Sequence, residues 1–168
     1  ILSGETVALV TDAGTPGISD PGGVLIQRIM TAGQQTNRTA GQHDIKIVPI
    51  PGPCAAVAAL SISGLPTDKF LFLGFPPHKK GRQTFWKKVA ACEETVVFYE
   101  SPHRILKSLM QLQENLRTGV PDYLHTPIVV CRELTKMFES VYRGTIENII
   151  ELVQKDPIKG EYVVVVAV

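Results

Sequence analysis

A loop of small and polar residues at positions 10–22 has the composition best suited to binding a ligand. It reads Val-Thr-Asp-Ala-Gly-Thr-Pro-Gly-Ile-Ser-Asp-Pro-Gly, with three glycines, two prolines, two carboxylates and three hydroxyls. An apolar run at 7–10 precedes the loop, and a segment with helical spacing follows it. Open α/β sheets build ligand sites where a strand ends in such a loop, because glycines let the backbone approach a ligand closely. The loop therefore predicts a binding edge for a polar metabolite.

Three junctions between an expected strand and an expected helix share one design. Asp20-Pro21, Gly52-Pro53 and Ser101-Pro102 each place a proline at the first helical turn. A helix start presents free N–H groups and the positive end of the helix dipole, which suits a carboxylate, a hydroxyl or a phosphate. Ordinary capping explains any one junction equally well, but three of them beside glycine-rich loops favour ligand binding.

Polar groups also follow two later strands. The segment 98–104 (FYESPHR) and the segment 131–136 (CRELTK) place acids, bases and a histidine just beyond apolar runs. The alternative is a set of caps and salt bridges at the strand ends. The segment 51–59 (PGPCAAVAA) is a tight turn followed by a helix with small side chains. Such a helix suits close packing on a sheet and also leaves space for a flat ligand.

A basic segment with two aromatic residues lies at 78–88. Residues 79–88 hold five cations and no acid, and Phe85 and Trp86 lie among them. Cations contact phosphates and aromatic rings stack on bases, so the pairing suits single-stranded nucleic acid. The alternative is a solvated amphipathic helix whose aromatic residues face the core.

The composition is that of an ordinary globular protein. The chain has 168 residues, 44% of them hydrophobic, and a formal net charge of +1, which argues against a globally basic nucleic-acid coat. No apolar run has the length of a membrane span.

Three scattered cysteines indicate reduced thiols and a cytoplasmic location. The histidines lack metal-ligand spacing, so no metal is expected. The chain starts without methionine directly before a strand, which suggests a fragment lacking its N-terminal part.

Apolar periodicity predicts an α/β protein with a mixed, mainly parallel sheet. Helical faces are expected around residues 25–30, 105–116 and 146–153, and polar surface insertions at 34–44 and 118–126. The division into lobes is placed at 44/45, with residues 1–44 in the first lobe and 45–168 in the second, although the Pro49–Pro53 stretch is an alternative boundary. Strands are expected at 7–10, 45–50, 70–75, 95–100, 127–131, 138–142 and 161–168. The strand at 138–142 follows its predecessor too closely for a helical crossover, which predicts an antiparallel member.

Five motifs follow one another along the chain, at residues 7–22, 48–77, 95–105, 131–145 and 159–166. In this order they resemble the tetrapyrrole methylase superfamily of S-adenosylmethionine-dependent methyltransferases. The match is best with its branch that methylates the ribose 2′-hydroxyl of cytidine in small-subunit (16S) ribosomal RNA. The resemblance implies two three-layer α/β/α lobes, the first incomplete here, with the cofactor S-adenosyl-L-methionine between them, and a homodimer. The motifs are VALVTDAGTPGISDPG (7–22), VPIPGPCAAVAALSISGLPTDKFLFLGFPP (48–77), TVVFYESPHRI (95–105), CRELTKMFESVYRGT (131–145) and KGEYVVVV (159–166).

The resemblance also assigns cofactor-binding residues at the strand ends. Two departures bear on that assignment: the family's N-terminal glycine- and proline-rich cofactor loop is absent, and Cys54 stands where serine is expected. The residues implied are Asp12, Ala13, Gly14, Thr15, Ile18, Ser19, Cys54, Ala55, Tyr99, Glu100, Leu134, Thr135, Gly160 and Glu161.

Transfer of a methyl group from a sulfonium is an in-line displacement, so the enzyme must chiefly align donor and acceptor. A ribose hydroxyl is a weak acid, and a positioned base would help; the candidates are Glu100, His103 and Glu133. The residues expected to contact RNA are Lys79, Lys80, Arg82, Arg104, Arg132 and Lys136.

Two other functions remain open. A porphyrin or corrin C-methyltransferase would use the same scaffold, although the basic segment 78–88 argues against it. The third possibility is a truncated, non-catalytic module that only binds RNA or a partner.

Overall fold

The computed structural model describes residues 5–35, 45–157 and 159–168. The chain divides into two compact units, Ile1–Cys54 and Ala55–Val168. The boundary between these compact units follows the Pro49–Pro53 stretch. Most of the insertion expected at 34–44 lies outside the described residues.

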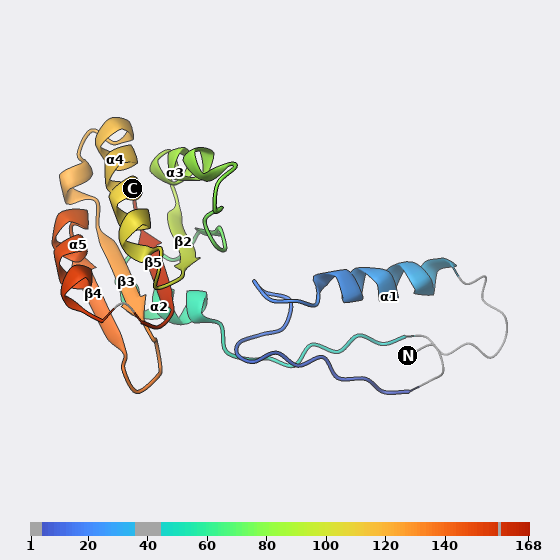
Figure 1. Ribbon diagram of the computed structural model, residues 1–168. Coiled ribbons are helices and arrows are strands. Elements are labelled where there is room, and N and C mark those ends of the chain that lie inside the picture. The colour runs from blue at the N-terminus through green and yellow to red at the C-terminus, as the bar shows by residue number, and fades with distance from the viewer. Residues whose placement is uncertain (1–4, 36–44, 158) are drawn as a thin grey trace. The chain divides into compact units, whose positions relative to one another are not determined.

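The first unit holds helix α1, Gly23–Gln35, and extended segments on either side of it (Figure 1). The strands expected at 7–10 and 45–50 are not formed. A strand needs a hydrogen-bonded neighbour, and neither run pairs with another segment of the described chain. Several apolar side chains of this unit are consequently exposed, for example Val10 at 81%.

The second unit is built on a five-stranded sheet in the order β1-β2-β5-β3-β4. Its strands are β1 Phe70–Phe72, β2 Thr95–Glu100, β3 Ile128–Arg132, β4 Ser140–Gly144 and β5 Tyr162–Val166. Strand β1 pairs with β2 in parallel, whereas β5 is antiparallel to both β2 and β3, and β4 is antiparallel to β3. The mixed sheet and the antiparallel strand near 138–142 are confirmed. Mainly parallel pairing is wrong for this sheet, because β5 runs back between β2 and β3.

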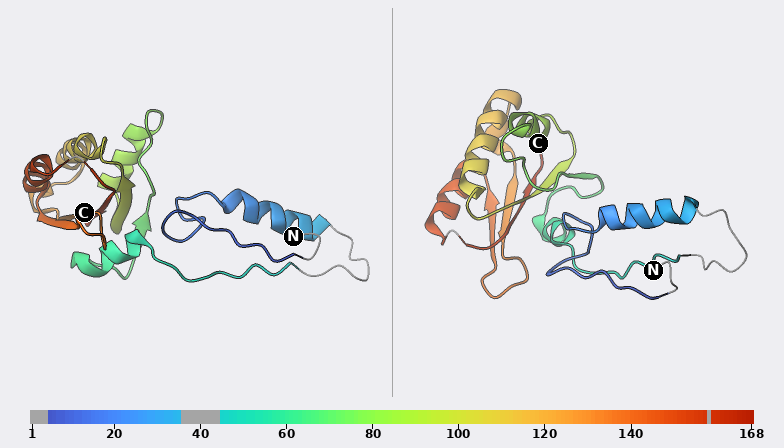
Figure 2. Two further views of the ribbon diagram at one scale, coloured as in Figure 1. Left: turned by 60° about the horizontal axis from the view of Figure 1, so that its bottom comes forward. Right: turned by 45° about the vertical axis from the view of Figure 1, so that its right-hand side comes forward.

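Helices cover both faces of this sheet and give three layers (Figures 1 and 2). Helices α3 Arg82–Ala90, α4 Ile105–Gly119 and α5 Ile146–Lys155 lie on one face, and α2 Ala55–Ser63 lies on the other. The 118–126 insertion contains a short 3-10 helix, Tyr123–His125. No helix in the described part of the chain is both long and apolar enough to traverse a lipid bilayer.

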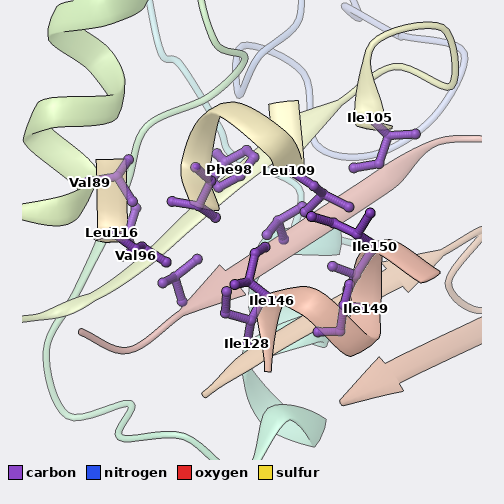
Figure 3. Packing of buried hydrophobic residues seen from close by; sticks show 14 of the residues in the cluster. Val89, Val96, Phe98, Ile105, Leu109, Leu116, Ile128, Ile146, Ile149 and Ile150 are labelled. Carbon is purple, nitrogen blue, oxygen red and sulfur yellow. The ribbon is translucent and has the colours of Figure 1, made fainter. Parts of the chain in front are cut away.

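The main core lies between the sheet and helices α3–α5 (Figure 3). Helix α4 contributes Ile105, Leu109, Leu112 and Leu116, all with no exposed surface, as its 3.6-residue spacing predicts. Alternate strand residues such as Val96 and Phe98 meet this helical face. On the opposite face, the buried alanines of α2 let that helix pack on the sheet.

Candidate functional site

The polar segments predicted from the sequence converge at one edge of the sheet in the second unit. Strands β1, β2 and β3 end there, and β5 begins there, because β5 runs in the opposite direction. Tyr162, the first residue of β5, pairs with Glu100 on one side and with Arg132 on the other. The segments 99–101, 132–136 and 160–162 are therefore neighbours in space.

Successive residues of a strand face opposite sides of the sheet, and this alternation divides the edge in two. Tyr99 and Cys131 both pair with Val163, and Tyr99 lies on the face covered by α2. Glu100 and Arg132 both pair with Tyr162 and lie on the face covered by α3–α5. The cofactor residues predicted at 99 and 100 thus have side chains on opposite faces.

Tyr99 connects the end of β2 to the start of α2. The backbone N–H of Ala56, in the first turn of α2, donates a hydrogen bond of 3.0 Å to the Tyr99 hydroxyl oxygen. The Tyr99 ring makes edge contacts with Phe72 and Phe75, at centroid distances of 4.9 and 5.6 Å. These contacts fix Tyr99 between β1 and α2, beside the small residues Ala55 and Ala56.

The segment after β3 is a strained loop held against the start of β5. Glu133 and Thr135 have φ angles of 47° and 67°, values that side-chain-bearing residues rarely adopt. The Glu133 N–H donates to the Glu161 carbonyl at 3.0 Å, and the Glu161 N–H donates to Glu133 Oε1 at 2.9 Å. Non-glycine residues in this conformation cost energy and cluster at ligand sites. Among the described residues the third such case is Ser19, which belongs to the predicted cofactor loop of the first unit.

The carboxylate of Glu133 is held ionised. The Glu161 N–H and the Lys136 ammonium, 2.9 Å from Oε1, lower the pKa of Glu133 below its ordinary value. Lys136 also lies 3.3 Å from Glu161 Oε2, and the hydrogen bond to Glu133 is the main cause that raises the pKa of Lys136. A carboxylate with a lowered pKa is a good hydrogen-bond acceptor and a weak proton acceptor.

Glu100 is a fully buried carboxylate whose two oxygens are engaged by protein groups. Oε1 accepts hydrogen bonds from the Ser101 N–H and the Arg104 guanidinium, both at 2.7 Å. Oε2 accepts a hydrogen bond from the Ser108 hydroxyl at 2.5 Å. The carboxylate of this predicted base and cofactor residue is thus enclosed on the α3–α5 face. His103, another of the three predicted bases, is exposed in the turn before α4.

The cations expected to contact RNA fall into two groups. Lys79, Lys80 and Lys136 are exposed, Lys136 with the carboxylate partners already described. The arginines face inward: Arg82 and Arg132 are 8% exposed, and the side chain of Arg104 is 19% exposed and paired with Glu100. Arg132 donates to the Lys159 carbonyl at 2.8 Å and to Asp156 at 3.2 Å. Their guanidinium groups are therefore committed to internal partners.

The aromatic residues of the basic segment also face the interior. Trp86 has no exposed surface. The ring centroid of Phe85 lies 4.9 Å from that of Trp86 and 5.8 Å from that of Phe98. The alternative stated for this segment, an amphipathic helix with aromatic residues turned to the core, describes α3. The Trp86 ring is therefore inaccessible to a base, whereas Phe85 is half-buried.

The remaining predicted cofactor residues lie in the first unit, around the loop 12–20. The Thr15 hydroxyl donates to the Pro53 carbonyl at 3.1 Å, which ties this loop to the segment before Cys54. Gly14, with φ 77°, lies beside the same carbonyl: a Cβ there would be 3.7 Å from Pro53 O. The first unit therefore brings together the loop 12–20 and the stretch that ends at Cys54, two segments that the resemblance assigns to the cofactor. The others assigned there are Asp12, Ala13, Ile18 and Ser19.

The polar network inside the α3–α4 layer was not predicted from the sequence. Arg82 donates to Gln111 at 2.6 Å and to Ser108 at 2.7 Å, and Trp86 Nε1 donates to Gln111 at 3.1 Å. Ser108 lies three residues after Ile105 on the buried stripe of α4. A serine on an otherwise apolar stripe was the available indication of a buried polar partner.

Comparison with known proteins identifies the family. The family of tetrapyrrole (corrin/porphyrin) methylases matches residues 1–150. The chain belongs to this family. Solved structures agree on the tetrapyrrole methylase fold: cobalt precorrin-4 methyltransferase aligns with a TM-score of 0.62 and 17% identity, covering 92% of this chain and 61% of that one. Uroporphyrin-III-C-methyltransferase from Thermus thermophilus aligns with a TM-score of 0.57 and 23% identity, covering 90% and 60%.

Curated proteins similar to this chain are named ribosomal RNA small subunit methyltransferase I. The protein from Synechocystis is 40% identical over 168 residues, covering 99% of this chain and 54% of the relative. That from Vibrio cholerae is 42% identical over 169 residues, covering 99% and 53%. The chain thus spans about half the length of the curated relatives it matches. The family and the fold expected from the sequence motifs are confirmed.

Proposed function

We propose that this chain is part of an S-adenosylmethionine-dependent enzyme that methylates the ribose 2′-hydroxyl of a cytidine in small-subunit ribosomal RNA. The observation that carries the proposal is the 40–42% identity, over 99% of the chain, with relatives named for methylation of that RNA. The tetrapyrrole methylases of known structure are only 17–23% identical and support the fold alone.

The donor groups at the sheet edge fit a cofactor with an adenosine end and an amino-acid end. The start of α2 offers backbone N–H groups beside the Tyr99 hydroxyl and small side chains that leave room for a flat ring. In the first unit, glycine-bearing backbone near Pro53 allows close approach of a ligand. S-adenosylmethionine supplies the reactive methyl group. We propose that it is held by Asp12, Ala13, Gly14, Thr15, Ile18, Ser19, Cys54, Ala55, Tyr99, Leu134, Thr135, Gly160 and Glu161.

The side chains at the edge would act mainly by orienting the acceptor. Glu133 is ionised and lies at the sheet edge beside Glu161, so it can accept a hydrogen bond from a ribose hydroxyl. Its lowered pKa opposes removal of the proton, which favours alignment over strong base catalysis. Glu100 is left out of the cofactor and base assignments because its carboxylate is enclosed on the sheet face covered by α3–α5. His103 remains the exposed candidate for accepting the proton.

We propose that RNA phosphates are contacted by the exposed lysines Lys79 and Lys80, with Lys87 and Lys88 of α3 as further cations. A phosphate contact needs an accessible charge, and these ammonium groups meet that requirement whereas the buried arginines do not. A homodimer and a cytoplasmic location belong to the same proposal.

The test uses the intact protein that contains this chain, with methyl-labelled S-adenosylmethionine and two acceptors. Small ribosomal subunits should gain label at one ribose, located by mass spectrometry of the RNA, and a uroporphyrinogen-type substrate should gain none. Label found only in the tetrapyrrole would establish the C-methyltransferase instead. RNA binding without transfer to either acceptor would establish the non-catalytic module.

A further inference from the structure

The buried carboxylate of Glu100 is the centre of a charged network with two arginines. Arg104 Nη2 lies 2.7 Å from Oε1, and Arg82 Nη2 lies 4.0 Å from Oε2. The Ser108 hydroxyl bridges the longer gap, because it accepts from Arg82 at 2.7 Å and donates to Glu100 at 2.5 Å. Glu100 therefore orients both guanidinium groups.

Each arginine uses its remaining donors on the same short loop. Arg104 Nη1 donates to the Pro76 carbonyl at 3.1 Å, and Arg82 Nη1 donates to the Pro77 carbonyl at 3.0 Å. The backbone N–H of Arg82 also donates to the Lys79 carbonyl at 3.2 Å. Successive carbonyls of one loop are thus held by two arginines that share one carboxylate. We call Glu100, Arg82 and Arg104 the arginine clamp.

The clamped loop joins the site edge to the exposed cations. At its start, Phe75 contacts the ring of Tyr99, and the Gly74 carbonyl accepts from the Tyr99 N–H at 2.9 Å. At its tip, His78, Lys79 and Lys80 are exposed. Gly81, with φ 85°, then turns the chain into α3. The position of Lys79 and Lys80 relative to the site edge thus depends on the backbone that the clamp holds.

We propose that Glu100 is a positioning residue, which acts through Arg82 and Arg104 to hold the 76–80 loop so that Lys79 and Lys80 each meet an RNA phosphate beside the site edge. The proposal rests on the RNA substrate proposed above. Replacement of a buried ion pair by apolar residues is often neutral for stability, so stability alone gives a weak reason for three charges here. Fixing the loop before binding lowers the entropy cost of placing two flexible lysines on RNA phosphates, which gives a functional reason.

The test compares four variants of the intact protein for RNA affinity at several salt concentrations and for cofactor affinity. Lys79→Ala/Lys80→Ala removes two phosphate contacts and should lower the slope of log affinity against log salt by about 1.4. Glu100→Gln should produce most of that decrease, and its combination with the lysine pair should add little, since both changes remove the same contacts. Cofactor affinity should stay within about twofold for Glu100→Gln.

Thr95→Val is the matched control, because it removes a buried hydroxyl, which donates to the Pro66 carbonyl at 2.6 Å, without touching Glu100, either arginine or the two proline carbonyls that they hold. It should lower thermal stability and leave the salt slope unchanged. If Glu100→Gln fails to fold, Arg104→Gln replaces it, since this variant loses the Pro76 contact and leaves Arg82 beside Glu100. Independent, additive effects of the clamp and lysine variants would overturn the proposal, as would an equal loss of cofactor affinity.

A measurement without RNA separates this proposal from the proposed function. Hydrogen exchange of the peptide covering 74–81 should be faster in Glu100→Gln and Arg104→Gln than in the wild type or Thr95→Val. Unchanged exchange would overturn the clamp whatever the substrate is. Wild-type protein that neither binds nor methylates RNA would instead refute the proposed function, while faster exchange in the variants would still establish the clamp.

Discussion

Gly160 lies against the carboxylate side chain of Glu133. A Cβ atom built on Gly160 would lie 2.3 Å from Glu133 Cγ and 2.8 Å from Oε1, far inside van der Waals contact. Gly160 also has a φ of 83°, and Glu133 has a φ of 47°. The absence of a side chain at 160 thus allows the Glu133 carboxylate to reach the Glu161 N–H and Lys136.

Gly160→Ala should therefore destabilise the protein by more than conformational strain alone. Alanine at positive φ costs about 1–2 kcal/mol, and displacement of Glu133 adds to this. Gly64→Ala is the matched control, because Gly64 has a φ of 74° and no neighbouring atom within 4 Å of its Cβ position. Urea unfolding should show a larger loss for Gly160→Ala, and the excess should disappear in a Glu133→Ala background. Equal losses for the two glycine variants would show that the contact is unimportant.

The ion pair of Glu133 with Lys136 should make stability depend on pH in a defined direction. The pKa of Glu133 is lower in the folded state than in the unfolded state. Its ionised carboxylate therefore adds to the free energy of unfolding at pH values above the ordinary pKa of glutamate. This stabilisation is lost as the pH falls through the lowered pKa of the folded state. Lys136→Met should be less stable than wild type near neutral pH, and the difference should vanish in acid. Lys107→Met, at an exposed position of α4, is the control and should show no such trend. Unfolding free energies measured from pH 7 to 3 test this.

Tyr99→Phe should weaken the connection between β2 and α2. The variant keeps the ring contacts with Phe72 and Phe75 but removes the hydroxyl that accepts from the Ala56 N–H. Loss of one such hydrogen bond costs about 0.5–1.5 kcal/mol. Calorimetric titration should also show weaker binding of S-adenosylmethionine, whereas Tyr123→Phe, a tyrosine away from the site edge, should leave binding unchanged. Unaltered cofactor binding by Tyr99→Phe would remove that residue from the proposed site.

The thiol of Cys131 should be unreactive while the protein is folded. Cys131 lies in β3, between β5 and β4, with no exposed surface, and burial raises its pKa to about 11. The thiolate is the reactive species, so iodoacetamide at pH 8 should modify Cys131 only after unfolding. Peptide mass spectrometry measures this modification directly. Equal labelling of native and denatured protein would contradict the buried position.

Local sequence patterns determined much of the second unit. The apolar run 95–100 predicted β2 with the observed bounds, Thr95–Glu100. The stripe from Ile105 to Leu116 predicted the buried face of α4. Both predictions work because hydrophobic periodicity is a property of neighbouring residues and needs no knowledge of the partner surface. The motifs at the strand ends also indicated the family, because they follow one another along this chain in the same order as in the tetrapyrrole methylases.

Tertiary structure decided which charges are buried and in which direction the strands run. Arg82 was expected on the surface among cations, but its partners Glu100, Ser108 and Gln111 come from later segments that α3 meets only after folding. Strand β5 lies between β2 and β3 and is antiparallel to both of them. Its position and direction depend on these distant strands. The run at 7–10 has strand composition yet no strand partner in the described chain. Composition fixes how apolar a segment is, whereas hydrogen-bond partners and ion pairs are set by residues distant in sequence.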